Sequence, residues 1–255
     1  MEKITVTIIT KNEAHNIERC LKALVWADEI IIADSCSTDG TVDICKDYGC
    51  LVFSPEWEGF GKTKQLCVDR ASNNWILSID ADEVVSLPLK KKILSLPHDG
   101  NVTGYHIKRN SFYLGRLIKY SGWQGDYPLR LFRKENSRFT DDIVHEKVVT
   151  SGKAKRVETC LFHYTYPDIT THVRKMNRYS SLGAEKLFQS GKRSGFFKPI
   201  SHSGFRFFRM YIVNKGFLDC KEGFLLACLT SFEVFLKYYK LWELQKLKKT
   251  GSDDF

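Results

Sequence analysis

The sequence lacks the short signatures that assign many proteins to a class at once. Its eight cysteines form no Cys-x-x-Cys pair, and their spacing fits no zinc framework. No apolar run reaches the roughly 18 residues that a membrane-spanning helix needs. The first apolar run ends before Lys11, which makes it too short for a signal peptide. We therefore expect a cytoplasmic protein whose cysteines are reduced thiols.

Two nucleotide-binding fingerprints are also missing. The loop Gly59–Gln65 contains two glycines, but it lacks the complete spacing of a phosphate-binding P-loop. No Gly-x-Gly-x-x-Gly follows the first predicted strand, which counts against a dinucleotide-binding protein. Internal repeats and low-complexity segments are absent as well. The class of the protein must therefore be inferred from the arrangement of its elements.

The charge of the chain is distributed unevenly. The 255 residues carry a net charge of +9, and 43% of them are hydrophobic, as is typical of a globular protein. Residues 1–100 hold 11 Lys and Arg against 16 Asp and Glu, a net charge of −5, whereas residues 101–255 hold 28 against 14, a net charge of +14. This asymmetry indicates two roles. The basic part could bind nucleic acid, an anionic membrane surface or a phosphorylated substrate.

Strands and helices alternate strictly in the first part of the chain. Apolar, β-branched runs predict strands over Ile4–Ile9, Glu29–Asp34, Leu51–Phe53 and Trp75–Asp80. Helical spacing predicts helices over Ala14–Val25, from near Thr41, and over Thr63–Ser72. This order predicts an α/β fold with a mainly parallel sheet, right-handed crossovers and flanking helices.

Three of these strands end in polar clusters, at Thr10–Glu13, Asp34–Asp39 and Asp80–Glu83. The carboxyl ends of parallel strands share one edge, where open α/β sheets place their ligand sites. Asp80 and Asp82 are a natural pair of oxygen ligands for a divalent cation. The alternative is a polar turn in which Asp82 or Glu83 caps the helix that begins near Pro88. The convergence of the three clusters favours a functional site.

Beyond Leu87 the alternation of strands and helices ends. Strands are predicted over Thr103–Lys108 and Leu129–Arg133, and a helix over Ile169–Ser190. Arg130 and Arg133 are candidates for contacts with acidic sugars or phosphates of a substrate. A solvated strand face is the alternative for these two arginines.

The C-terminal part combines aromatic and basic residues. Phe205–Val213 interleaves aromatic residues with arginine, and Gly223–Gln245 is an apolar-rich helix followed by lysines. This helix is too charged and its apolar part too short to span a bilayer, so it fits a position in the membrane interface. A helix docked on the domain, or a dimer contact between C-terminal helices, is the alternative.

At three places the sequence resembles the family 2 glycosyltransferases, which have the GT-A fold, a Rossmann-like nucleotide-diphospho-sugar transferase fold. The matching segments are Ile8–Glu13, Ile32–Thr41 and Ile79–Glu83, and their order and spacing agree with the family. Val144–Glu146, His163–Tyr164 and the basic aromatic tail further resemble the bacterial lipopolysaccharide core β-1,4-glucosyltransferases. We therefore expect a catalytic domain over residues 1–195, with a nucleotide-sugar-binding half (1–100) and an acceptor-binding half (101–195). A basic, amphipathic helical region over residues 196–255 would associate with a membrane.

The resemblance implies a nucleotide site at the first two polar clusters. Thr10, Asn12 and Glu13 would line the nucleotide pocket, and Asp34 would hydrogen-bond the uracil of a UDP-sugar donor. The lysine that approaches the nucleotide would be Lys62 or Lys64. Gln65 stands where many relatives have asparagine.

The third polar cluster would be the metal site. By the resemblance, Asp80 would lie toward the ribose and the metal, and Asp82 would bind the metal. The cation would be Mg²⁺ or Mn²⁺, which suit carboxylate, water and phosphate oxygens. His163 is a candidate for a third metal ligand, with a hydrogen-bonded structural histidine as the competing interpretation.

The implied reaction is a single displacement that inverts the sugar carbon. A divalent cation neutralises the charge that grows on the departing diphosphate. The sugar carbon becomes oxocarbenium-like, and a carboxylate on the opposite face takes the proton of the acceptor hydroxyl. Glu146, which His145 could orient, is the predicted base. Asp142 and Asp141 are the alternatives, and a solvated acidic turn is the competing interpretation of all three.

The implied enzyme is a metal-dependent hexosyltransferase that moves a hexose, glucose by the narrower resemblance, to a lipid-linked core oligosaccharide. It would be peripheral on the inner face of the inner membrane, held at this anionic surface by its C-terminal region. One alternative is a family 2 transferase with a polyprenyl-phosphate or capsule acceptor. Another is a basic binding module without catalysis. No nucleic-acid-binding signature occurs, so we expect no nucleic-acid partner, whereas oligomers could form through the C-terminal helices.

Overall fold

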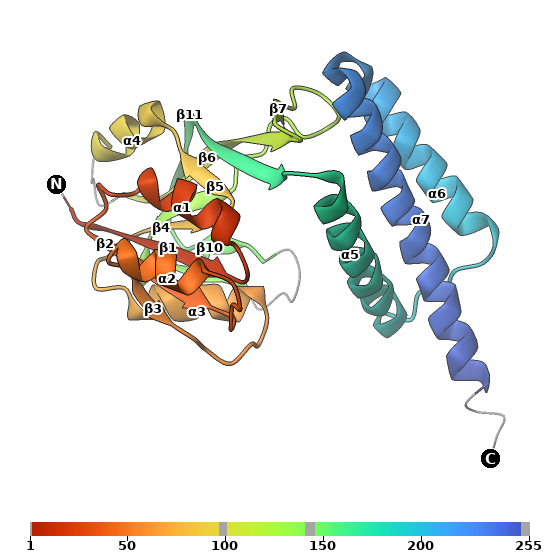
Figure 1. Ribbon diagram of the computed structural model, residues 1–255, viewed down its shortest axis with the longest axis horizontal. Helices are drawn as coiled ribbons and strands as arrows, with labels where there is room; N and C mark the ends of the chain where they lie inside the picture. Colours follow the sequence, from red (N-terminus) through yellow and green to blue (C-terminus); the bar gives the residue numbers. More distant parts are fainter. Residues whose placement is uncertain (1, 97–100, 141–145, 251–255) are drawn as a thin grey trace. The chain divides into compact units, whose positions relative to one another are not determined.

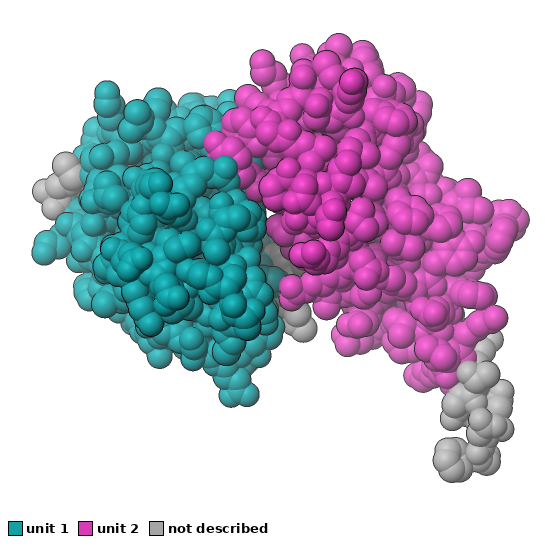
Figure 2. Space-filling model, in the orientation of Figure 1, with its two compact units in different colours: residues 1–110, 125–163 teal, residues 111–124, 164–255 magenta. Residues whose placement is uncertain are grey.

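The computed structural model describes residues 2–96, 101–140 and 146–250 (Figure 1). The chain forms two compact units, coloured separately in Figure 2. Unit 1 comprises residues 1–110 and 125–163, and unit 2 comprises residues 111–124 and 164–255. This division differs from the boundary that we predicted after residue 195. The chain passes between the units three times, and two of these passages lie within long strands, β6 (Val102–Tyr113) and β11 (Lys153–Tyr166). A continuous strand gives no sign of a boundary in its sequence.

Four parallel strands form the first half of the sheet in unit 1, in the order β3-β2-β1-β4. They are β1 (Ile4–Thr10), β2 (Glu29–Asp34), β3 (Leu51–Phe53) and β4 (Trp75–Asp80). In the register of β1, Thr10 lies opposite Asp34 and Ile9 lies opposite Asp80. The predicted strands are thus confirmed almost to the residue, and their polar ends lie at one edge of the sheet.

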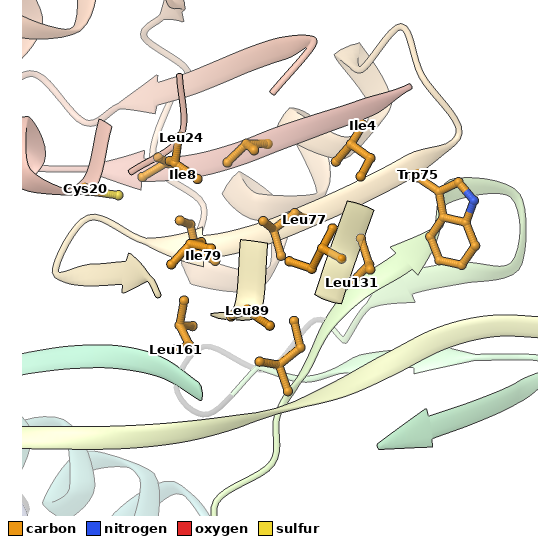
Figure 3. Close-up of a cluster of buried hydrophobic side chains, with 14 of the residues drawn as sticks. Ile4, Ile8, Cys20, Leu24, Trp75, Leu77, Ile79, Leu89, Leu131 and Leu161 are labelled. Carbon is orange, nitrogen blue, oxygen red and sulfur yellow. The ribbon is translucent and has the colours of Figure 1, made fainter. Parts of the chain in front are cut away.

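Helices cover both faces of these strands. They are α1 (Ala14–Lys22), α2 (Thr41–Asp47), α3 (Phe60–Arg70) and α4 (Leu87–Leu94). On one face, side chains of β1 and β4 such as Ile8 and Ile79 pack with Leu24 and with Leu89 of α4 (Figure 3). On the other face, Ile31 and Ile76 pack against α3. This burial of apolar strand residues from both faces is the main stabilising contribution in unit 1.

The second half of the sheet contains antiparallel pairs, namely β4 with β8, β8 with β6, and β11 with β5. The order continues as β4-β8-β6-β11-β5, where β8 is Leu129–Arg133 and β5 is Glu83–Val85. The short strand β7 (Arg116–Leu117) pairs with β6, and β9 (Ser137–Phe139) pairs with β10 (Val148–Thr150). Only Ala81 and Asp82 separate β4 from β5, although three strands lie between them in the sheet. The sheet therefore curls so that the far strand returns to the end of β4.

Unit 2 is built mainly from helices. They are α5 (Ile169–Gln189), α6 (Phe197–Phe208), a π-helical turn (Arg209–Val213), a 3-10 turn (Gly216–Asp219) and α7 (Cys220–Thr250). Helix α7 packs against both α5 and α6 (Figure 1). A small apolar core joins Tyr113 and Ile118 to Met210 and Leu226. Among the described residues, no helix combines the length and the apolar character needed to cross a bilayer.

Candidate active site

Asp80, the last residue of β4, lies between two cations. Lys64 of α3 approaches one carboxylate oxygen at 2.8 Å, and Arg130 of β8 approaches the other at 2.7 Å. Burial would raise the pKa of the Asp80 carboxyl, but the charges of Arg130 and Lys64 outweigh it and hold this pKa well below its usual value. Asp80 is therefore a fixed anion at the edge where the predicted polar clusters converge.

Glu83 holds the turn that follows β4. Its side chain is fully buried, and Arg130 lies 2.6 Å from one of its oxygens. The other oxygen accepts the backbone N–H of Asp80 at 2.9 Å. The alternative interpretation, in which Asp82 or Glu83 caps the following helix, is wrong, because the Ser86 hydroxyl accepts the N–H of Leu89 and caps α4. Glu83 instead ties both ends of the turn together.

Lys64 also binds the predicted base. Its ammonium lies 2.7 Å from the carboxylate of Glu146, a residue that is far from Lys64 in the sequence. Burial would lower the pKa of Lys64, but Asp80 and Glu146 together raise it above its usual value. Lys64 thus joins the polar end of β4 to Glu146. Asp142, Asp141 and His145 lie outside the described residues.

Asp82 faces His163 of β11 across the turn. The carboxylate of Asp82 lies 3.5 Å from Nε2 of His163, and both side chains are largely buried. Burial would lower the pKa of His163, but the charge of Asp82 raises it above its usual value. His163 is opposite Glu83 in the pairing of β11 with β5, so the curl of the sheet is what brings it here.

A divalent cation fits the Asp82–His163 pair only if most of its ligands come from elsewhere. Among the residues that the structure describes, no three His, Cys, Asp or Glu side chains are grouped so that they could hold a metal alone. Asp80, the other predicted ligand, is instead paired with Lys64 and Arg130. Mg²⁺-type sites commonly use one or two carboxylates together with substrate phosphates and water. The donor set therefore suits a cation that arrives with a diphosphate.

The first two polar clusters form one hydrogen-bonded loop system. The Thr10 hydroxyl donates to Asp34 at 2.8 Å, and the N–H of Ser37 donates to the other oxygen of Asp34 at 2.7 Å. Asn12 adopts a left-handed backbone with φ of +56°, which asparagine tolerates. Its side-chain oxygen accepts the N–H of Thr38 at 2.8 Å. The two loops therefore hold each other at the edge of the sheet, with Asp34 buried beneath them.

Glu13 and the two candidate lysines occupy distinct places. The N–H of Glu13 donates to the hydroxyl of Thr41 at 2.9 Å, which links the start of α1 to the start of α2. The carboxylate of Glu13 accepts from Asn16 at 2.8 Å. Lys62 is exposed and pairs with Glu58, one turn earlier, at 2.7 Å. Of Lys62 and Lys64, the structure brings only Lys64 to Asp80.

A model of glycosyl transferase family 2 matches residues 5–157, which contain all of these side chains except His163. The chain belongs to glycosyl transferase family 2. An uncharacterised glycosyltransferase of Rickettsia typhi is 31% identical over 274 residues, covering 100% of this chain and 92% of that protein. LpsC of Rhizobium meliloti, a lipopolysaccharide core biosynthesis glycosyltransferase, is 28% identical, covering 92% of this chain and 93% of its own length.

Two solved structures have the same fold. The mannosyltransferase PcManGT from Pyrobaculum calidifontis, in complex with GDP-Man and Mn²⁺, matches with a TM-score of 0.55 at 14% identity. This match covers 94% of the present chain and 87% of PcManGT. TarS 1–349 from S. aureus in complex with UDP matches with a TM-score of 0.51 at 15% identity, covering 96% and 92%. The predicted GT-A fold is confirmed.

The structure corrects our interpretation of two arginines of this family 2 chain. Arg130 was a candidate for binding an acidic substrate, but it is buried between Asp80 and Glu83. Arg133 is opposite Trp75, at the start of β4, and lies at the other end of the strand from Asp80. The antiparallel pairing of β8 with β4 separates the two side chains in this way, and an isolated strand sequence does not reveal it.

Sequence reasoning did not single out Arg109 and Asp126, which extend the charge network. Arg109 lies 3.3 Å from Glu83, and its Nε donates to Asp126 at 2.7 Å. Acids and bases therefore alternate from Glu146 through Lys64, Asp80, Arg130, Glu83 and Arg109 to Asp126. No motif signalled Arg109, because its partners become neighbours only when the sheet curls.

Proposed function

We propose that this family 2 glycosyltransferase moves a hexose from a UDP-sugar to a lipid-linked core oligosaccharide, with inversion at the sugar carbon. The observation that carries the proposal is the position of Lys64, which binds both Asp80 and Glu146. It brings a predicted donor-binding acid and the predicted base to one place at the carboxyl edge of the sheet. That edge is where ligands bind in open α/β folds.

The donor would occupy the loops that follow β1 and β2. Thr10, Asn12 and Glu13 would line the nucleotide pocket, and Asp34 would act at the uracil. Asp34 already accepts hydrogen bonds from Thr10 and Ser37, so it would also hold in place the loop that lines the uracil site. Support for a nucleotide-sugar donor comes from fold neighbours that were solved with UDP, UDP-GlcNAc and GDP-Man.

The metal would bind between Asp82 and the diphosphate, with His163 as a further ligand and Asp80 close by. When bound, Mg²⁺ or Mn²⁺ would supply charge neutralisation for the leaving diphosphate. A complex of PcManGT that contains Mn²⁺ supports a divalent cation in this fold. Binding through His163 requires neutral imidazole, so metal affinity would fall when that ring is protonated.

Glu146 would act as the general base. Its carboxylate would take the proton of an acceptor hydroxyl while that oxygen forms a bond to the sugar carbon. The bond from this carbon to the phosphate oxygen breaks, and UDP departs with the electron pair. Lys64 would orient Glu146 through their ion pair. Asp142 is the reserve candidate for the base.

The acceptor and the site of action are inferred from likeness to a relative. LpsC of Rhizobium meliloti, named for lipopolysaccharide core biosynthesis, aligns along nearly the whole chain. An enzyme with such an acceptor would work on the inner face of the inner membrane, held there by a basic and aromatic C-terminal region. A transferase with a polyprenyl-phosphate or capsule acceptor is the second candidate, because the likeness to LpsC is modest at 28% identity.

A transfer assay tests the function directly. The purified chain is incubated with a panel of UDP-sugars, with Mg²⁺ or Mn²⁺, and with either truncated lipopolysaccharide or polyprenyl phosphate, and the products are weighed by mass spectrometry. We expect hexose transfer to the truncated lipopolysaccharide. Transfer only to polyprenyl phosphate would reject the core acceptor, and transfer to neither would reject the function.

Asp82→Ala is the variant that tests the metal assignment in that assay. We expect it to lower turnover by at least about 10³-fold, because charge stabilisation by a metal contributes several kcal/mol to the transition state. Asp126→Ala, which removes an acid at the far end of the charge network, is the control and should retain most activity. Normal turnover by Asp82→Ala would refute the assignment of Asp82 as a metal ligand.

A further inference from the structure

One side of α6 and of the π-helical turn is apolar but uncovered. Five side chains there are 47–80% exposed, namely Phe197, Ile200, Phe205, Phe208 and Ile212. Their spacing of 3, 8, 11 and 15 residues from Phe197 places them along one side of a helix. Pro199 and Met210, on the opposite side, are buried. We call these five residues the aromatic face.

The aromatic face lies on a side of α6 that the other helices of unit 2 do not cover. Helix α7 packs between α5 and α6, so among these three helices α6 is covered mainly on the side that faces α7 (Figure 1). Soluble proteins seldom expose clustered large apolar side chains unless another surface covers them. A stripe of three phenylalanines and two isoleucines therefore calls for an apolar partner.

The segment that carries the aromatic face is basic. Residues 192–221 contain seven Lys and Arg, and all seven are exposed: Lys192, Arg193, Lys198, Arg206, Arg209, Lys215 and Lys221. Their single acid, Asp219, is buried and accepts the N–H groups of Lys119 and Tyr120 at 2.9 Å each. The partner of this surface must therefore be both apolar and anionic.

We propose that the aromatic face inserts into the interface of an anionic lipid bilayer, with the surrounding cations on the lipid head groups. Aromatic side chains are favoured at the boundary between head groups and acyl chains, and each nearby Lys or Arg adds attraction to anionic lipid. This inference rests on the proposed function, because a lipid-linked acceptor requires an enzyme at a membrane surface. It assigns the contact to α6 and the π-helical turn.

This assignment differs from the helix that the sequence indicated. We predicted that Gly223–Gln245 would lie in the membrane interface as an amphipathic helix. In the structure its apolar residues are distributed around α7, because one side meets α5 and another meets α6. Leu226 and Leu241, for example, are fully buried. Packing between two helices therefore accounts for part of the apolar character of α7, whereas Phe224, Phe232, Trp242 and Leu247 remain 39–63% exposed.

A second copy of this chain is a poorer partner for the same surface. In a symmetric dimer the same patch meets itself, so the cations around one aromatic face would meet those around the other. Like charges opposed across an interface are repulsive, and the segment offers no exposed acid to neutralise them. An anionic bilayer satisfies both requirements at once.

Vesicle sedimentation of the full chain tests the inference. The chain should bind vesicles of phosphatidylcholine with phosphatidylglycerol and bind vesicles of phosphatidylcholine alone weakly. Phe205→Ser with Phe208→Ser should lower the partition coefficient by at least about 10-fold, since two large apolar side chains are removed from the contact. Val25→Ser with Leu51→Ser, which changes two exposed apolar residues of unit 1, should bind like the unchanged chain.

A charge variant and a measurement of mass separate the remaining outcomes. Lys198→Glu with Arg209→Glu should also weaken binding and should reduce its dependence on salt. Wild-type binding by the phenylalanine variant would overturn insertion. A dimer in sedimentation velocity that the phenylalanine variant splits, with no vesicle binding, would assign the face to a second copy. Vesicle binding needs neither donor nor metal, so its failure leaves the proposed transfer reaction intact, and the reverse also holds.

Discussion

Glu83 shows how one side chain fixes the geometry of the candidate site. A fully buried carboxylate is costly unless charged donors surround it. Here Arg130, Arg109 and the N–H of Asp80 supply them. Since the N–H belongs to the residue that begins the turn, Glu83 holds the backbone of the turn that carries Asp80 and Asp82. Its neighbours in sequence bind substrate in our proposal, whereas Glu83 positions them.

Lys64→Met, compared with Lys62→Met, tests the ion pairs of Lys64 with Asp80 and Glu146. Removing a buried cation leaves Asp80 and Glu146 without a shared partner, so we expect a loss of about 3 kcal/mol in the free energy of unfolding. We also expect kcat/KM to fall at least ~10-fold, because Glu146 loses its orientation. Chemical denaturation and the transfer assay measure the two effects.

Lys62→Met is a matched control on the same helix. Lys62 forms an exposed pair with Glu58, and such pairs contribute about 0.3–0.5 kcal/mol. Its stability and turnover should stay close to those of the unchanged chain. Equal losses in the two variants would refute the role that we give to Lys64.

At the scale of elements, the sequence predicted what is local. The strands β1 to β4 and the helices around them follow from apolar spacing, which depends on neighbouring residues only. The ends of α1 and α3 differ from the prediction by a turn or less, since helix ends depend on weak capping contacts. Thr10, Asp34 and Asp80 were brought together correctly because parallel strands share an edge.

Contacts made by the curl of the sheet could not be predicted in this way. Arg130, Arg109 and the burial of Glu83 depend on which strands become neighbours after β4, and no local pattern encodes that order. The sequence indicated the aromatic and basic segment Phe205–Val213, but it did not indicate which of its side chains form the aromatic face. Its residues and those of α7 are equally apolar in sequence, and only packing shows which of them remain exposed.

Gly61→Ala tests how closely α3 approaches Thr140 and Glu146. A Cβ at Gly61 would overlap the carbonyl oxygen of Thr140 and would lie 3.4 Å from Cβ of Glu146. A backbone oxygen cannot move cheaply, so we expect a loss of about 1–3 kcal/mol in unfolding free energy. A roughly 10-fold fall in kcat/KM should accompany it as Glu146 shifts.

Gly204→Ala in α6 provides the comparison for Gly61→Ala. Nothing lies within 4 Å of a Cβ at Gly204, so the substitution should stabilise its helix by about 0.5–1 kcal/mol. Denaturation of both variants under the same conditions measures the difference. Stabilisation by Gly61→Ala as well would show that α3 and Thr140 are not in contact.

At the scale of the whole molecule, each unit carries one of the two proposed binding sites. Unit 1 holds the alternating network of charges and the loops at the edge of the sheet. Unit 2 holds the basic residues of segment 192–221 and the aromatic face. Donor binding and membrane binding therefore involve different residues, and each should be measurable without the other.

Hydrogen exchange of the full chain tests this separation. UDP with Mn²⁺ should slow exchange at residues 10–13, 34–41 and 80–83, because a ligand at 100 times its Kd adds about 2.7 kcal/mol to stability. Exchange at residues 197–213 should not change. Anionic vesicles should produce the reverse pattern, and Asp82→Ala or a chelator should remove the part of the first effect that depends on metal. Slowing at residues 197–213 by UDP with Mn²⁺, without slowing at the loops, would contradict the assignment of the donor site to unit 1.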